Sequence, residues 1–182
     1  VAGVAVFTVG VVAGQTTGSL LVDRLGLTGT GRRAVTVRRV VAAALAVAAV
    51  AVGVSDRLAS AGGVLVFALL AIVAGALLAP QQAFNGRVGL AGRSPFVGAW
   101  GNFAGGAVAM CAVLGVAVLL GLDLADPWGA APWAYVGGVL GFAVIVGGAW
   151  AVPVLGVLVY SLLSLFGQLA GALVLDLLAP TP

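Results

Sequence analysis

Residues 3–25 read GVAVFTVGVVAGQTTGSLLVDRL, and residues 156–178 read GVLVYSLLSLFGQLAGALVLDLL. The two stretches align without gaps at an offset of 153, and nine of their 23 aligned positions are identical. A composition this apolar gives roughly three identities by chance, so the match indicates an internal repeat. The polar identities weigh most, because apolar matches are common in such a chain. They pair Gln15 with Gln168 and Asp23 with Asp176.

The composition places this repeat in a membrane. Of the 182 residues, 63% are hydrophobic and only 7% are charged, namely eight arginines and five aspartates. Soluble domains contain about 45–50% apolar residues, and disordered chains contain fewer, so both classes are disfavoured. The chain has no His, Lys or Glu, and Cys111 is its only cysteine. Catalysis by those missing residues, an intrachain disulfide and a Cys/His zinc site are therefore excluded.

Long runs without charge predict membrane-spanning helices, each of which needs about 20 apolar residues. The run from 127 to 175 has 49 uncharged residues, enough for two spans. We expect the break at Pro153, near Gly147, Gly148 and Gly156, because proline lacks a backbone N–H and glycine weakens a helix. The runs lack the period-two alternation of barrel strands. The sequence therefore predicts an all-α integral membrane protein with six transmembrane helices, at about 3–22, 39–55, 62–84, 96–121, 133–151 and 154–176.

The arginines predict the orientation of these helices. An alternating topology places seven of the eight on one side, which we expect to be cytoplasmic: Arg24, Arg32, Arg33, Arg38, Arg39, Arg87 and Arg93. The opposite loops carry Asp56 with Arg57, and Asp123 with Asp126. Tryptophan and tyrosine are expected to mark the outer interface at Trp128, Trp133 and Tyr135, and the inner one at Trp100 and Trp150. We therefore expect a multi-pass protein of the plasma (inner) membrane that binds no nucleic acid.

The two copies of the repeat are predicted to run in opposite directions. Five helices separate equivalent points, and an odd number reverses the direction of the chain. Inverted repeats are typical of secondary transporters, in which two such halves exchange inward and outward shapes around one site. An ancient duplication without transport is the alternative interpretation.

Further motifs resemble the YdcZ-like family of the drug/metabolite transporter superfamily. They are the segment from Pro80 to Gly89, Ser94-Pro95, the segment from Trp133 to Gly138 with Gly141, and the Gly-Gln and later Asp of each repeat copy. The resemblance implies five-helix repeats, with residues 1–55 forming the last two helices of one and residues 56–182 the first four of the next. It implies a ten-helix protein with three helices before Val1 and one after Pro182. It also implies a small-molecule exporter, without naming the substrate.

A glutamine in each copy is a candidate for lining a substrate path. An amide in the middle of an apolar helix is costly unless it is paired or faces a cavity. Thr8 lies seven residues before Gln15, and Ser161 lies seven before Gln168, so each copy places a hydroxyl and an amide on one helix face. The open alternative is that these groups only join helices by hydrogen bonds.

A second candidate follows Pro80, which we expect to interrupt the hydrogen bonding of the third helix. Gln81 and Asn85 share a face there, with Gln82 between them. Amides at a broken helix are typical of transporter binding sites. The alternative is a polar helix end at the membrane interface. Asn102 is a weaker candidate.

Glycines and aspartates are the remaining residues for which the sequence predicts a role. Helix-packing surfaces are predicted at Gly10, Gly14, Gly18, Gly167 and Gly171. Asp23 and Asp176 lie at the C-terminal ends of their helices, where the helix dipole disfavours a carboxylate. We expect them to pair with arginines or to cap a neighbouring helix.

These patterns favour a secondary transporter that exports or exchanges a small polar or amphipathic molecule by alternating access. The chain has no P-loop, no nucleophile–base pair and no metal-binding cluster, so we expect neither an enzyme nor a cofactor or metal. The expected partners are a small-molecule substrate, the lipid bilayer, and either a second copy in a homodimer or the missing helices of a longer chain. The alternative function is a non-transporting membrane scaffold or assembly subunit.

Overall fold

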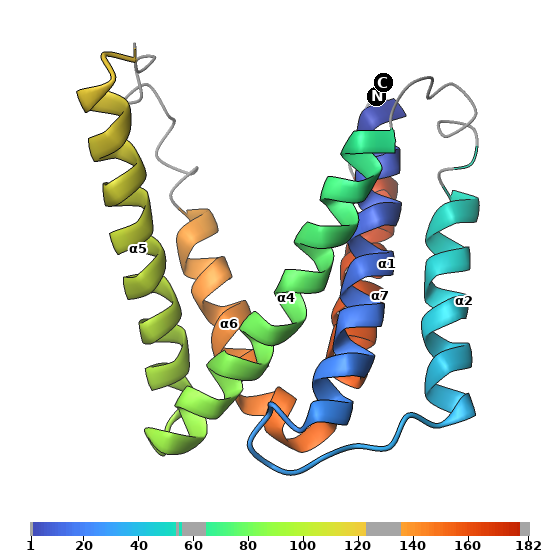
Figure 1. Cartoon of the computed structure of the whole chain (residues 1–182). Helices are drawn as coiled ribbons and strands as arrows, with labels where there is room; N and C mark the ends of the chain where they lie inside the picture. The colour runs from blue at the N-terminus through green and yellow to red at the C-terminus, as the bar shows by residue number, and fades with distance from the viewer. Residues whose placement is uncertain (1, 54, 56–64, 123–135, 179–182) are drawn as a thin grey trace.

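The computed structural model describes residues 2–53, 55, 65–122 and 136–178 and is helical over most of them (Figure 1). The helices are α1 (Ala2–Leu25), α2 (Val37–Gly53), α4 (Leu65–Ala91), α5 (Pro95–Leu119), α6 (Val136–Leu155) and α7 (Val157–Leu178). All of these except α2 are long and apolar enough to cross a membrane. The predicted all-α membrane architecture is therefore confirmed, and the described residues contain the six expected helices. With 17 residues, α2 is shorter than a full span.

Some residues named above lie outside the described part of the chain. They are Asp56, Arg57, Asp123, Asp126, Trp128, Trp133 and Tyr135, together with the side chain of Asp176.

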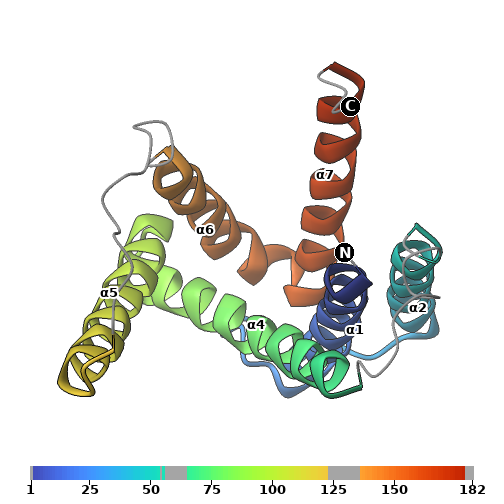
Figure 2. The same cartoon turned by 90° about the horizontal axis from the view of Figure 1, so that it is seen from above.

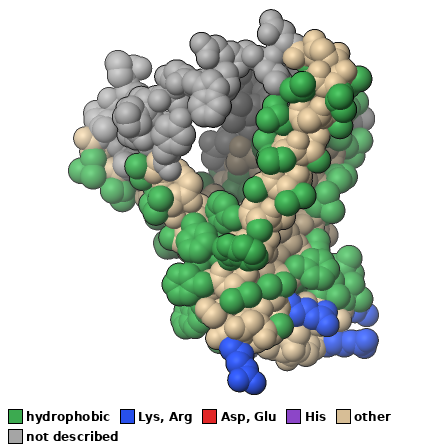
Figure 3. All heavy atoms as spheres, turned by 90° about the vertical axis from the view of Figure 1, so that its left-hand side faces the viewer, with side chains coloured by type: hydrophobic (Ala, Val, Ile, Leu, Met, Phe, Trp, Pro, Cys, Tyr) green, Lys and Arg blue, Asp and Glu red, His purple; other side chains and the backbone are tan. Residues whose placement is uncertain are grey.

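The helices converge at one end of the bundle and part toward the other (Figure 1). The converging end carries the α1–α2 loop with Arg32 and Arg33, and we call it the arginine end. Figure 3 shows arginines at this end, beyond a surface covered by hydrophobic side chains. α1 runs toward the arginine end and α7 runs away from it, so the two repeat copies are antiparallel. Seen from above, α7 leans away from α1 toward its own C-terminus (Figure 2).

The backbones of α1 and α4 touch through glycines. A Cβ on Gly14 would overlap the Ile72 carbonyl, and a Cβ on Gly75 would overlap the Val11 carbonyl. Gly10 and Gly18 lie against the same helix, which brings α1 and α4 into close, parallel contact. The glycines of the other copy differ, because a Cβ on Gly167 or Gly171 would find nothing within 4 Å among the described residues.

Two prolines do not interrupt their helices as the sequence led us to expect. α4 continues through Pro80 and ends at Ala91 rather than near residue 84. α6 continues through Pro153, and the chain breaks at Gly156 instead. Proline removes one N–H but its fixed φ is compatible with a helix, whereas Gly156 has a φ of +87°, which L side chains rarely adopt. The change of direction therefore follows the glycine.

Gly14→Ala should destabilise the protein because the added methyl group forces α1 away from the Ile72 carbonyl. We expect a loss of about 1–3 kcal/mol, measured as a lower thermal stability of the detergent-purified protein. Gly167→Ala adds the same methyl group where no described residue lies within 4 Å, and it serves as the matched control. Equal stability of the two variants would contradict the role of Gly14 in packing.

The orientation can be tested with single cysteines in a Cys111→Ala background. Ala34→Cys lies in the α1–α2 loop, and Leu122→Cys lies just after α5, at the opposite end. In intact cells an impermeant maleimide should label position 122 and spare position 34, and everted vesicles should give the reverse. Labelling of position 34 from outside would show that the arginine end is not cytoplasmic.

Candidate functional site

Polar side chains from three helices meet at Ser161, on the second turn of α7. Its hydroxyl donates to Oε1 of Gln82 on α4 at 3.0 Å and accepts from Nε2 of Gln15 on α1 at 3.4 Å. The hydroxyl of Ser19 lies 3.3 Å from it. Ser161 is only 4% exposed, and an unpaired polar group is costly in such surroundings. We call these four residues the Ser161 cluster; it joins α1, α4 and α7.

Two adjoining cavities lie beside this cluster, and we call them the central cavities. The larger, of about 240 Å³, lies among α1, α4, α6 and α7, and the smaller, of about 180 Å³, lies between α1 and α7. Both are lined by Val11, Gln15, Ser164 and Gln168. Nε2 of Gln168 donates to Oγ of Ser164 at 3.3 Å, so this bond lies within α7 and joins no second helix.

The lining combines neutral polar groups with apolar walls. Amides and hydroxyls come from both repeat copies and from α4, and apolar contacts come from residues such as Leu78, Val144 and Leu165. None of the described residues that line the two cavities is charged. A charged ligand would lose its hydration here without gaining an opposite charge, so the chemistry suits a neutral molecule with hydrogen-bonding groups and an apolar part.

Five of the six residues singled out from the sequence as path candidates line the central cavities: Gln15, Gln168, Asn85, Thr8 and Ser161. Gln81 does not. Its Nε2 donates to Oδ1 of Asn102 on α5 at 2.9 Å, and Nδ2 of Asn85 donates to the same oxygen at 3.3 Å. Gln81 therefore joins α4 to α5, whereas Asn85 lies between that contact and the larger cavity.

Sequence reasoning did not select three residues that line the cavities, namely Gln82, Ser164 and Tyr160. A signal existed for Gln82, because it lies seven residues after Gly75 and shares the α4 face that touches α1. Ser164 lies one turn from both Ser161 and Gln168. Tyr160 gave no polar signal of its own; its hydroxyl donates to the Val144 carbonyl at 3.4 Å and connects α7 to α6.

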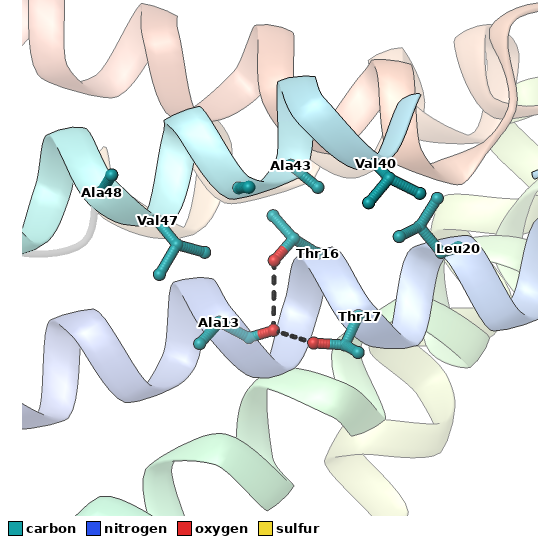
Figure 4. A pocket seen from close by; sticks show the side chains of 9 residues that line it. Ala13, Thr16, Thr17, Leu20, Val40, Ala43, Val47 and Ala48 are labelled. Carbon is teal, nitrogen blue, oxygen red and sulfur yellow. Dashed lines mark hydrogen bonds between the residues drawn. The ribbon is translucent and has the colours of Figure 1, made fainter. Parts of the chain in front are cut away.

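A separate hollow of about 430 Å³ between α1 and α2 has a different character (Figure 4). Among the described residues that line it, the only polar side chains are those of Thr16 and Thr17, and both hydroxyls donate to the Ala13 carbonyl within their own helix. The other described lining residues are Ala, Val and Leu. This surface suits packing against apolar groups, and we do not assign it to the substrate path.

A family model described as "Putative inner membrane exporter, YdcZ" matches residues 1–52 and 66–180. The chain belongs to this YdcZ exporter family. The resemblance drawn from the sequence motifs is thereby confirmed. Family membership and the five long apolar helices together make the chain a multi-pass membrane protein of a transporter family. No curated protein and no solved structure matches it.

In this YdcZ-family chain, Ser161→Ala should lower stability because the amides of Gln15 and Gln82 lose their shared partner. We expect about 1–3 kcal/mol, the usual cost of leaving buried polar groups unsatisfied, read as a fall in thermal stability in detergent. Ser164→Ala is the matched control, since the described bond of that hydroxyl stays within α7. If both alanine variants lose the same stability, the Ser161 cluster does not hold the three helices together.

Proposed function

We propose that this chain forms the moving core of a secondary transporter that exports a small neutral amphipathic molecule by alternating access, with the central cavities as its substrate site. One observation carries the proposal. The smaller cavity lies between α1 and α7, the antiparallel copies of the repeat, and equivalent glutamines from both copies line it. Antiparallel copies around one site are the arrangement by which transporters exchange inward and outward shapes.

The family match supports the proposed division into repeats. Its two stretches, 1–52 and 66–180, fall on either side of the boundary that we place between residues 55 and 56. The first stretch covers α1 and all but the last residue of α2, and the second covers α4 from its second residue through α7. In the proposed ten-helix protein, the remaining helices complete the walls of the site.

The shape of the bundle supports an outward-open state. Hydrogen bonds join α1 to α7 at the arginine end, and the two helices diverge toward the opposite end (Figure 2). With the arginine end cytoplasmic, the central cavities communicate with the outer side. Export then requires that α7 move relative to α1, so that the arginine end opens while the other end closes. A non-transporting scaffold has no need for a cavity lined by neutral polar groups at this position.

Gln168→Leu tests the proposed site. Leucine has a similar volume but no amide, and the described bond of Gln168 lies within its own helix, so folding should be little affected. Loss of a hydrogen bond to substrate should lower transport about tenfold. The measurement compares cells that produce the complete protein or the variant, with export of neutral amphipathic compounds quantified by mass spectrometry of the medium and normalised to membrane abundance.

Two matched variants sharpen this experiment. Leu169→Val changes an exposed neighbour that lines neither central cavity and should transport normally. Gln15→Leu removes the equivalent amide of the other copy and also a bond to Ser161, so it should lower both transport and stability. Normal export by Gln168→Leu would move the substrate site away from these glutamines. A parallel fall of export and abundance would make Gln168 a structural residue.

A further inference from the structure

Asp23 is a buried carboxylate that accepts hydrogen bonds from the first turn of another helix. Its side chain is fully buried near the end of α1. Oδ1 accepts the backbone N–H of Val157 at 2.8 Å, and Oδ2 accepts that of Leu158 at 3.2 Å. These amides belong to the first turn of α7, where a helix has no internal acceptors for them and where its dipole favours negative charge. The carboxylate therefore caps α7 from α1.

Two arginines complete this contact. Arg39, at the start of α2, forms an ion pair with Oδ2 of Asp23. Arg33 donates to the carbonyls of Pro153 at 3.1 Å and Val154 at 2.7 Å, in the last turn of α6. A carboxylate thus lies at the positive end of α7 and a guanidinium at the negative end of α6, so both helix dipoles are complemented on the two sides of the break.

Gly156 allows the carboxylate to approach this closely. A Cβ there would lie 2.9 Å from Oδ2 of Asp23 and 2.8 Å from Cδ of Arg33, closer than side-chain carbons come to such atoms. The positive φ and the close approach both require glycine. The sequence repeat places Gly3 at the equivalent position of the other copy.

The repeat assigns a counterpart to this contact at the opposite end of the bundle. Subtracting the offset of 153 converts Val157 and Leu158 into Val4 and Ala5, and adding it converts Asp23 into Asp176. The same operation converts the Gln15–Ser161 bond into a pair formed by Gln168 and Thr8, which both line the smaller cavity. The Asp23 cap and the Gln15–Ser161 bond therefore each have an equivalent pair of residues toward the other end, where α7 leans away from α1 (Figure 2). The Ser19–Ser161 contact does not, because Ala172 is equivalent to Ser19.

We propose that Asp23 is a latch that holds the arginine end of the transport path closed, and that Asp176 forms the equivalent latch on the first turn of α1 when the arginine end opens. This inference rests on the proposed function. Hydrogen bonds suit such a contact because the bonds of Asp23 to the first turn of α7 can be exchanged for equivalent bonds at the other end, which lowers the difference in free energy between the two states. The protein then alternates between them without a large barrier from lost bonds.

Thiol accessibility in the complete protein tests the latch. In a Cys111→Ala background, Val22→Cys reports on the closed seam at the arginine end, because Val22 is buried against α4, α6 and α7. Thr8→Cys reports on the open side, because Thr8 is an exposed residue of the smaller cavity. An impermeant maleimide is applied from the arginine side for position 22 and from the opposite side for position 8.

Asp23→Asn keeps one acceptor but removes the charge and the ion pair. It should raise the alkylation rate at position 22 about three- to tenfold and lower the rate at position 8. Asp176→Asn should shift both rates in the opposite directions. Arg39→Gln removes the ion pair but keeps the hydrogen bonds of Asp23 to the first turn of α7. It should act like Asp23→Asn with a smaller effect. It replaces Asp23→Asn if that variant does not accumulate.

The outcomes separate the latch from a static helix cap. If Asp23→Asn and Asp176→Asn move the two rates in the same direction, or lower abundance without changing the ratio of the rates, the latch is overturned. The Val22→Cys reporter with Asp23 and Asp176 both kept serves to test the proposed function itself. If position 22 in that protein never reacts from the arginine side under any condition, alternating access fails; if it reacts and the Asp variants do not change the balance, only the latch fails.

Discussion

The break between α6 and α7 interrupts the hydrogen bonding of the helices. The partners that the freed backbone groups find elsewhere determine how this bundle closes. Apolar surroundings make each unpaired N–H or C=O costly, and the break at Gly156 leaves amides on one side and carbonyls on the other. One short segment satisfies both sets. Asp23 accepts the amides of α7, while Thr30 and Arg33 donate to the carbonyls at the end of α6. Because that segment follows directly from α1, three helices have to meet at the arginine end.

The two main contacts of α1 differ in kind, and this difference suggests which parts move together. Against α4, the backbone approaches through Gly14 and Gly75 so closely that no side chain could intervene. Such an interface consists of many small dispersion contacts that are lost together when the helices part. Against α7, a few polar bonds at Asp23, Ser19 and Gln15 accompany the packing of Val22. Each of these can be replaced singly, so in the proposed cycle α1 and α4 move as one unit relative to α7.

Composition and charge-free runs predicted the helices and the membrane environment. The position of the break and the contacts of single residues depend on backbone angles and helix packing, which the sequence does not show directly. Charge-free runs predicted the helices because a bilayer requires about 20 apolar residues regardless of order. The break was placed at Pro153, three residues too early, because its position depends on a backbone angle at Gly156 and on the cap that Asp23 provides. The two alternatives stated for Asp23, pairing with an arginine and capping a helix, both occur at once.

The amides after Pro80 show the same limit. Gln81 and Gln82 are adjacent and chemically identical, yet one joins α4 to α5 and the other joins the Ser161 cluster. Which glutamine faces α7 is set by the rotation of α4 about its axis, and the contact of Gly75 with Val11 fixes that rotation. An interruption of the helix at Pro80 would have changed this rotation, but α4 is continuous. A single helix-helix contact therefore decides the role of a residue seven positions away.

The sequence left open whether Gln15 and Gln168 join helices or line a path, and the structure places the two differently. Both glutamines border the two cavities, but Gln15 bridges to α7 through Ser161, whereas the described bond of Gln168 lies within its own helix. A static inverted repeat would give equivalent residues equivalent roles. A bundle that is closed at one end and parted at the other would not, because each copy then occupies a different half of the proposed cycle. On this view the two roles belong to both glutamines in turn: the amide on the closed side holds the helices together while its equivalent on the open side is available to a substrate.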